Sequence, residues 1–214
     1  YANKIARQID DLKVRMPSAS IVLLVDLVRS GSFDQIESFV EKYSSSLPEI
    51  VQIFCNGWAK VTLGEMNEGL NQFSSMKNEV RLLSNYHSAI ALALEGDFSN
   101  AAIFLDQMEG TDLIFDNNDY LALAQIYSQN GKIEKAQNIL QKGNITNDDL
   151  GYEEAFLKLS QNKALKFDAF LTPTDAIASI FSIMSRIGSQ KNDKSLSTIF
   201  YLRLAESLAS DKSF

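Results

Sequence analysis

The chain has 214 residues, of which 45% are hydrophobic, so it can bury a sizeable core and is not expected to be disordered. It carries 27 Asp and Glu residues against 20 Lys and Arg residues, a formal net charge of −7. Because a net-negative surface repels a polyanion, we expect no nucleic-acid partner.

The apolar runs and the single cysteine exclude further classes. The longest runs, SIVLLVDLV and AIALAL, are far shorter than the roughly 20 residues that span a bilayer, so no membrane span is expected. One cysteine, Cys55, leaves no internal disulfide and no multi-cysteine zinc site.

Residues 1–15 predict an amphipathic helix. Ala2, Ala6 and Ile9 have the spacing expected of the second helix of a helix pair. The first helix of that pair would precede Tyr1, so we expect the chain to belong to a longer array of repeats.

Four glycines then mark a repeat. Gly31, Gly64, Gly96 and Gly131 are 33, 32 and 35 residues apart, and each stands between two apolar helical patterns. A glycine in this place is typical of a helix that ends at a residue with positive φ. We therefore predict four helix pairs within residues 18–143, at 18–48, 50–80, 82–112 and 117–144.

The C-terminal part predicts further helices over residues 152–211, after a turn-rich connector, NITNDDLG. Thr172, Pro173 and Asp175 are favourable at a helix start. We expect these helices to be diverged repeats of the same array. The fold class is thus all-α, with about 12 helices.

The fourth helix pair, DYLALAQIYSQNGKIEKAQNILQKG, resembles the tetratricopeptide repeat. The matching positions are Tyr120, Leu123, Ala124, Tyr127, Gly131, Ala136, Leu140 and Gly143. The resemblance implies an α-solenoid of antiparallel helix pairs wound as a right-handed superhelix. The stretches NGWAKVTLGEMNEGLNQF, YHSAIALALEGDFSNAA and LTPTDAIASIFSIMSRIGSQ are similar to one group of alphaproteobacterial tetratricopeptide-repeat proteins. That likeness implies an exported, periplasmic protein without a known enzymatic activity, with the cytoplasm as the alternative compartment.

Reactive residues are few. Cys55 and His87, the single histidine, occupy the same position in consecutive repeats and could form a thiol–imidazole pair. A catalytic cysteine also needs an orienting third group and an oxyanion site, and neither has a sequence signal here. No phosphate-binding loop, GxSxG or HExxH motif occurs. We therefore expect no enzyme activity, no cofactor and no metal, and we interpret His87 as scaffold.

The resemblance places the first helix of each pair on a concave groove. The candidate groove residues are Ile21, Val25, Phe54, Trp58, Val61, Tyr86, Ile90, Leu121 and Gln125. This stripe is apolar and aromatic in the first three helix pairs and polar in the fourth. We therefore expect a protein or peptide partner with an apolar or amphipathic segment, with Phe54 and Trp58 as the residues that anchor it.

Two alternatives stay open. Aromatic residues at helical spacing are more often core than ligand contacts, and the protein's own terminal helices could fill the groove. The array could also be a self-association segment of a longer chain, which would make the protein a homo-oligomer.

Overall fold

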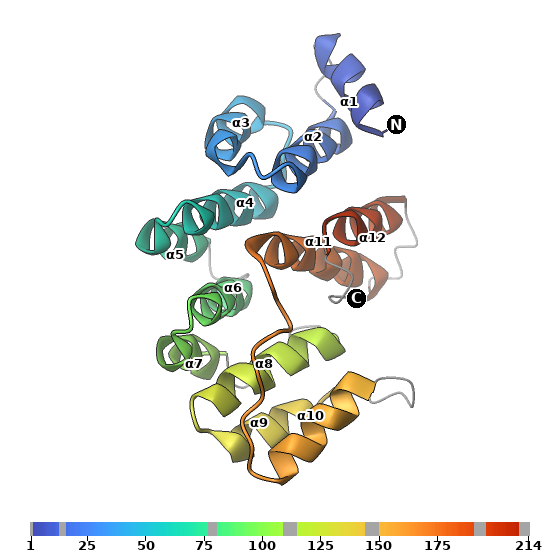
Figure 1. The fold of residues 1–214 in the computed structure, drawn as a ribbon. Helices are drawn as coiled ribbons and strands as arrows, with labels where there is room; N and C mark the ends of the chain where they lie inside the picture. Colours follow the sequence, from blue (N-terminus) through green and yellow to red (C-terminus); the bar gives the residue numbers. More distant parts are fainter. Residues whose placement is uncertain are drawn as a thin grey trace. The chain divides into compact units, whose positions relative to one another are not determined.

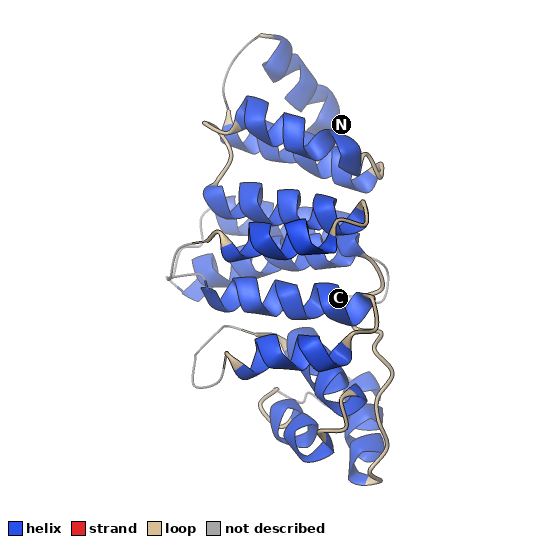
Figure 2. Cartoon of the chain, turned by 90° about the vertical axis from the view of Figure 1, so that its left-hand side faces the viewer, coloured by secondary structure: helices blue, strands red, loops and turns tan. Residues whose placement is uncertain are grey.

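The computed structural model describes residues 2–12, 16–76, 81–108, 115–143, 150–190 and 196–209. Over these ranges the chain forms twelve α-helices and one 3-10 turn, with no strand (Figure 2). The predicted all-α fold and helix number are confirmed. Several predicted spans lie outside the described residues: residues 1, 13–15, 77–80 and 109–112, the connector at 144–149, and residues 191–195 and 210–211.

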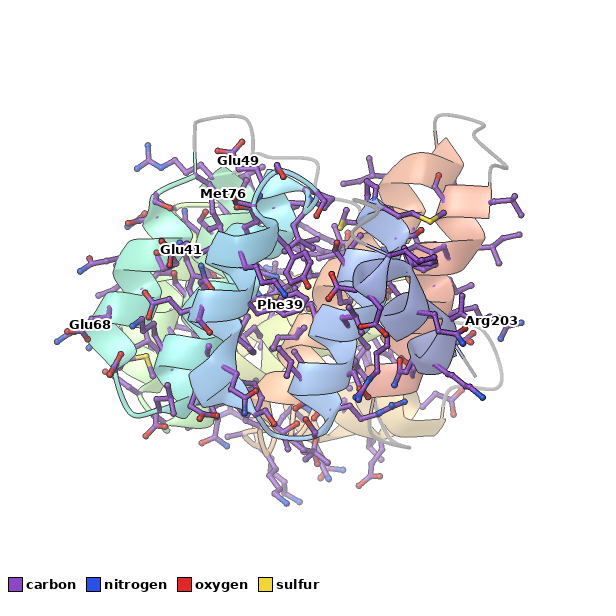
Figure 3. The ribbon with its side chains drawn as sticks, turned by 90° about the horizontal axis from the view of Figure 1, so that it is seen from above. Phe39, Glu41, Glu49, Glu68, Met76 and Arg203 are labelled. Atoms are coloured by element: carbon purple, nitrogen blue, oxygen red, sulfur yellow. The ribbon has the colours of Figure 1, made fainter. Side chains whose placement is uncertain are left out.

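The chain divides into two compact units, and the first takes in residues 1–78 and 173–209. Its elements are α1 (Ala2–Asp11), α2 (Pro17–Arg29), η1 (Phe33–Gln35), α3 (Ile36–Tyr43), α4 (Glu49–Thr62), α5 (Met66–Ser74), α11 (Pro173–Gln190) and α12 (Leu196–Leu208). Consecutive helices pack together, and α11 also packs on α4 while α12 packs on α2 (Figure 1). Figure 3 shows the exposed side chains of Glu41 and Glu68 on the outside of this unit and that of Arg203 on α12.

The second unit takes in residues 79–172. Its helices are α6 (Arg81–Leu94), α7 (Phe98–Asp106), α8 (Asn117–Gln129), α9 (Ile133–Leu140) and α10 (Leu150–Ser160). Each of these helices packs on the next one described, and α10 also packs on α8. Residues 163–172 follow α10 without regular secondary structure (Figure 1), and we call them the docked segment.

The four repeat glycines end their helices in one common geometry. Gly31, Gly64, Gly96 and Gly131 have φ of 73°, 84°, 81° and 73°. At each of them the glycine N–H donates to the carbonyl three residues back, and the next N–H donates to the carbonyl five residues before it. This is the Schellman motif, in which a residue without Cβ adopts the left-handed conformation at no steric cost. The predicted helix ends are therefore confirmed.

Two other glycines let α4 and α5 approach closely. A Cβ added to Gly57 would lie 2.3 Å from Cε1 of Phe73, and one added to Gly69 would lie 2.5 Å from Cγ2 of Val61. The ring of Phe73 fills the space beside Gly57 and is fully buried. Neither position has room for a side chain.

We expect Gly57→Ala to lower the free energy of unfolding by about 1–3 kcal/mol, because the new methyl group overpacks against the Phe73 ring. Urea unfolding followed by circular dichroism measures this change. The double variant Gly57→Ala/Phe73→Leu is the matched control and should recover part of the loss. An unchanged midpoint in Gly57→Ala would contradict the close packing of the two helices.

Candidate functional site

The candidate groove residues are mostly buried. Leu121 is half-buried; the buried ones are Ile21 and Val25 on α2, Phe54, Trp58 and Val61 on α4, Tyr86 and Ile90 on α6, and Gln125 on α8. Their surroundings differ between the two units, so each unit is described separately.

In the first unit the two proposed anchors face the second helix of their own pair. The ring of Phe73 on α5 lies 5.5 Å from that of Phe54 and 5.4 Å from that of Trp58, measured between centroids. Both anchors are completely buried. Phe54 and Trp58 are therefore core residues in this structure. This agrees with the alternative interpretation of the sequence, in which aromatic residues at helical spacing are core rather than partner contacts.

The C-terminal helices cover the first helices of unit 1. α11 packs on α4, and α12 packs on α2. Six apolar residues of α11 are fully buried: Ala176, Ile177, Ala178, Ile180, Phe181 and Ile183. A helix that is apolar on most sides belongs in a core, so α11 is a central helix of this unit.

In the second unit the docked segment lies on the first helix of the fourth pair. The side chain of Gln125 on α8 is buried and makes three hydrogen bonds to it. Its Oε1 accepts from the backbone N–H groups of Asp168 and Ala169, both at 3.0 Å, and its Nε2 donates to Oδ1 of Asp168 at 2.8 Å. One amide thus satisfies two adjacent backbone donors and a side-chain acceptor.

Three further side chains of α8 hold the backbone of the docked segment. The Oγ of Ser128 accepts from the N–H of Leu165 at 2.9 Å, and the Nε2 of Gln129 donates to the Leu165 carbonyl. Nearer the start of α8, the Nδ2 of Asn118 donates to the Ala169 carbonyl at 3.4 Å. Because the segment forms no helix or strand ladder, these side chains supply the partners that its backbone needs.

Two aromatic residues of the docked segment pack against α6 and α7. The ring of Phe170 lies 6.4 Å from that of Tyr86 on α6, and the ring of Phe167 lies 6.1 Å from that of Phe98 on α7, both edge to face. Phe170 is buried and Phe167 is half-buried. The predicted groove residue Tyr86 therefore meets a segment of the same chain.

Tyr86 is itself held in place by a buried hydrogen bond. Its hydroxyl donates to Oδ1 of Asp119 at 2.6 Å. Asp119 and Asp116 form a reciprocal capping box at the start of α8, in which each side chain accepts from the backbone N–H of the other. The position of the Tyr86 ring is thus coupled to the end of the helix that carries Gln125.

Cys55 and His87 have electrostatic properties opposite to those of a catalytic pair. Burial raises the pKa of the Cys55 thiol to about 12 and lowers the pKa of His87 to about 3. A reactive pair needs a thiolate beside an imidazolium, which requires a lowered thiol pKa. Cys55 also belongs to unit 1 and His87 to unit 2.

Two other kinds of site have no structural signal in the part of the chain that is described. No group of three or more His, Cys, Asp and Glu side chains there is placed to hold a metal ion. None of the helices described combines the length and the apolar character needed to cross a bilayer.

Comparison with known proteins adds no relative. No family model, no curated protein and no solved structure matches the chain. The interpretation of the site therefore depends on its own geometry.

The docked segment is the part of the site that the groove residues alone did not indicate. Leu165, Phe167 and Ala169 alternate with the polar residues Lys166 and Asp168. Alternation with a period of two is typical of an extended chain with one buried side. This pattern is the signal that could have located the segment.

We expect stability to fall below pH 6.5, the ordinary pKa of histidine, because the unfolded chain then binds a proton at His87 that the folded chain does not. At pH 5 this proton binding lowers the free energy of unfolding by about 2 kcal/mol. Urea unfolding between pH 7 and pH 5 should show a shallower pH dependence in His87→Gln than in the wild type. Identical pH dependence would contradict a neutral, buried His87.

Proposed function

We propose that the chain is a non-catalytic helical-repeat scaffold that binds another protein. In this proposal its helix pairs are antiparallel tetratricopeptide-like repeats of an α-solenoid, and the first helix of the fourth pair presents the binding face. The common glycine turns at spacings of 33, 32 and 35 residues and the pairwise packing of consecutive helices support it.

The observation that carries the proposal is the docked segment on α8. Gln125, Ser128 and Gln129 bind the backbone of a peptide that lacks regular secondary structure. Side chains that pair with a peptide backbone, with apolar pockets beside them, are the chemistry of peptide recognition. The first-helix face of the fourth pair is therefore equipped to hold an extended chain.

The burial of Phe54 and Trp58 changes where the partner should bind. The sequence places the anchors of the groove on α4, where α5 and α11 now cover the helix. We therefore locate the partner contact on unit 2, around Leu121 and Gln125.

A photo-crosslinking amino acid at Leu121 tests this function. Leu121 is half-buried on α8, and Ile103, an exposed residue on α7, is the matched control position. After irradiation in cell extract, we expect position 121 to form a covalent adduct with a second protein and position 103 to form none.

The products distinguish the competing functions. A partner of a different sequence at position 121 supports the scaffold, whereas an adduct with a second copy of this chain supports self-association instead. Absence of any adduct at position 121, or equal adducts at both positions, would contradict the proposed binding face.

A further inference from the structure

The docked segment is bound to α8 in the way a peptide ligand is bound. It has no regular secondary structure, and α8 side chains contact the Leu165 N–H and carbonyl, the Asp168 N–H, and the Ala169 N–H and carbonyl. Its apolar side chains point into the unit, since Leu165, Ala169 and Phe170 are buried while Lys166 is exposed.

We propose that the Gln125 face of α8 is a peptide site occupied by the docked segment as a tethered ligand. Its partner in trans is a protein segment with the pattern of residues 165–170: an aliphatic residue, any residue, an aromatic residue, Asp, a small residue and an aromatic residue. This inference rests on the proposed scaffold function, and it names the partner's chemistry.

The backbone contacts require an extended partner. Oε1 of Gln125 accepts from two consecutive N–H groups, and Ser128 accepts from a third N–H three residues earlier. In a helical peptide these N–H groups would donate within the helix. The site therefore binds a segment whose backbone donors are free to meet α8.

The side-chain contacts set the pattern. The Nε2 of Gln125 donates to the carboxylate of Asp168, so an acceptor is required at that position. Ala169 is buried, which favours a small residue at this position, directly after the Asp. The aromatic residues on either side meet Phe98 and Tyr86, and edge-to-face aromatic pairs add affinity beyond their buried area.

Tethering makes the site weak toward a partner in trans. The docked segment is joined to α10 and α11, so its binding is intramolecular and benefits from a high effective concentration. A partner must displace it, and the apparent affinity falls by the fraction of molecules in which the site is open. Replacing the apolar residues that hold the docked segment on α8 should therefore strengthen binding of the same sequence when it is supplied as a separate peptide.

The test uses the full chain and a fluorescein-labelled synthetic peptide of residues 163–172. The released variant carries Leu165→Ser, Phe167→Ser and Phe170→Ser. By fluorescence anisotropy, we expect it to bind the peptide at least about tenfold more tightly than the wild type, because the competing ligand is gone. Circular dichroism and urea unfolding establish that the variant is folded.

A milder variant keeps the test decisive if the released variant unfolds. Phe167→Ser/Asp168→Gly changes only a half-buried and an exposed residue, and it removes one aromatic contact and one hydrogen bond. We expect it to bind the peptide more tightly than the wild type, by a smaller factor than the released variant.

A specificity switch separates this site from nonspecific binding. Gln125→Glu is added to the released variant, or to the milder variant if the released one does not fold. It replaces the amide that donates to the peptide carboxylate by a second carboxylate. We expect binding of the peptide to weaken about tenfold or more. A peptide with Asn in place of Asp168 should regain that binding, because its amide donates to the new carboxylate.

Two results would overturn the proposal: no peptide binding by a folded released or milder variant, or equal binding of a scrambled peptide. If position 121 still crosslinks to a partner while the peptide fails to bind, the scaffold function stands and only the tethered-ligand site is wrong.

Discussion

Every first helix from α2 to α8 ends at a glycine with φ between 73° and 84°, and the packing of each helix on the next depends on this turn. The same two hydrogen bonds close the helix end at all four positions. After each turn the next helical element packs on the helix before it, so one side of every first helix is covered by the element that follows it. The opposite side remains to be covered by something else, since a contiguous apolar stripe is not left in water.

The two units cover that side with different structures, and the polarity of the first helices explains the difference. Six residues before the glycine stand Val25, Trp58 and Ile90 in the first three pairs, but Gln125 in the fourth. In unit 1, α11 and α12 pack on α4 and α2, and a helix brings no unpaired backbone groups to an apolar surface. In unit 2 an irregular segment lies on α8, where Gln125 and the nearby Ser128 supply the polar atoms that its backbone requires.

The helix ends and the polar end of the groove stripe could be predicted from the sequence, whereas the covering elements could not. Gly131 with its flanking apolar patterns predicts a helix end locally, and Gln125 stands out because it breaks an apolar column. The packing of Trp58 against Phe73 within its own pair depends on the room left by Gly57, a three-dimensional match that helical spacing does not contain. The contact between α11 and α4 joins residues more than a hundred positions apart, and the sequence of neither helix indicates that it packs on the other.

Amide hydrogen exchange in the docked segment tests most directly whether α8 holds a peptide. Backbone amides outside helices and strands exchange rapidly unless they are otherwise bonded. In the wild type, we expect slow exchange at the amides of Asp168 and Ala169, which donate to Gln125. In Gln125→Ala we expect both to exchange rapidly while the helical amides of α9 keep their protection. Rapid exchange of these two amides in the wild type would contradict the account.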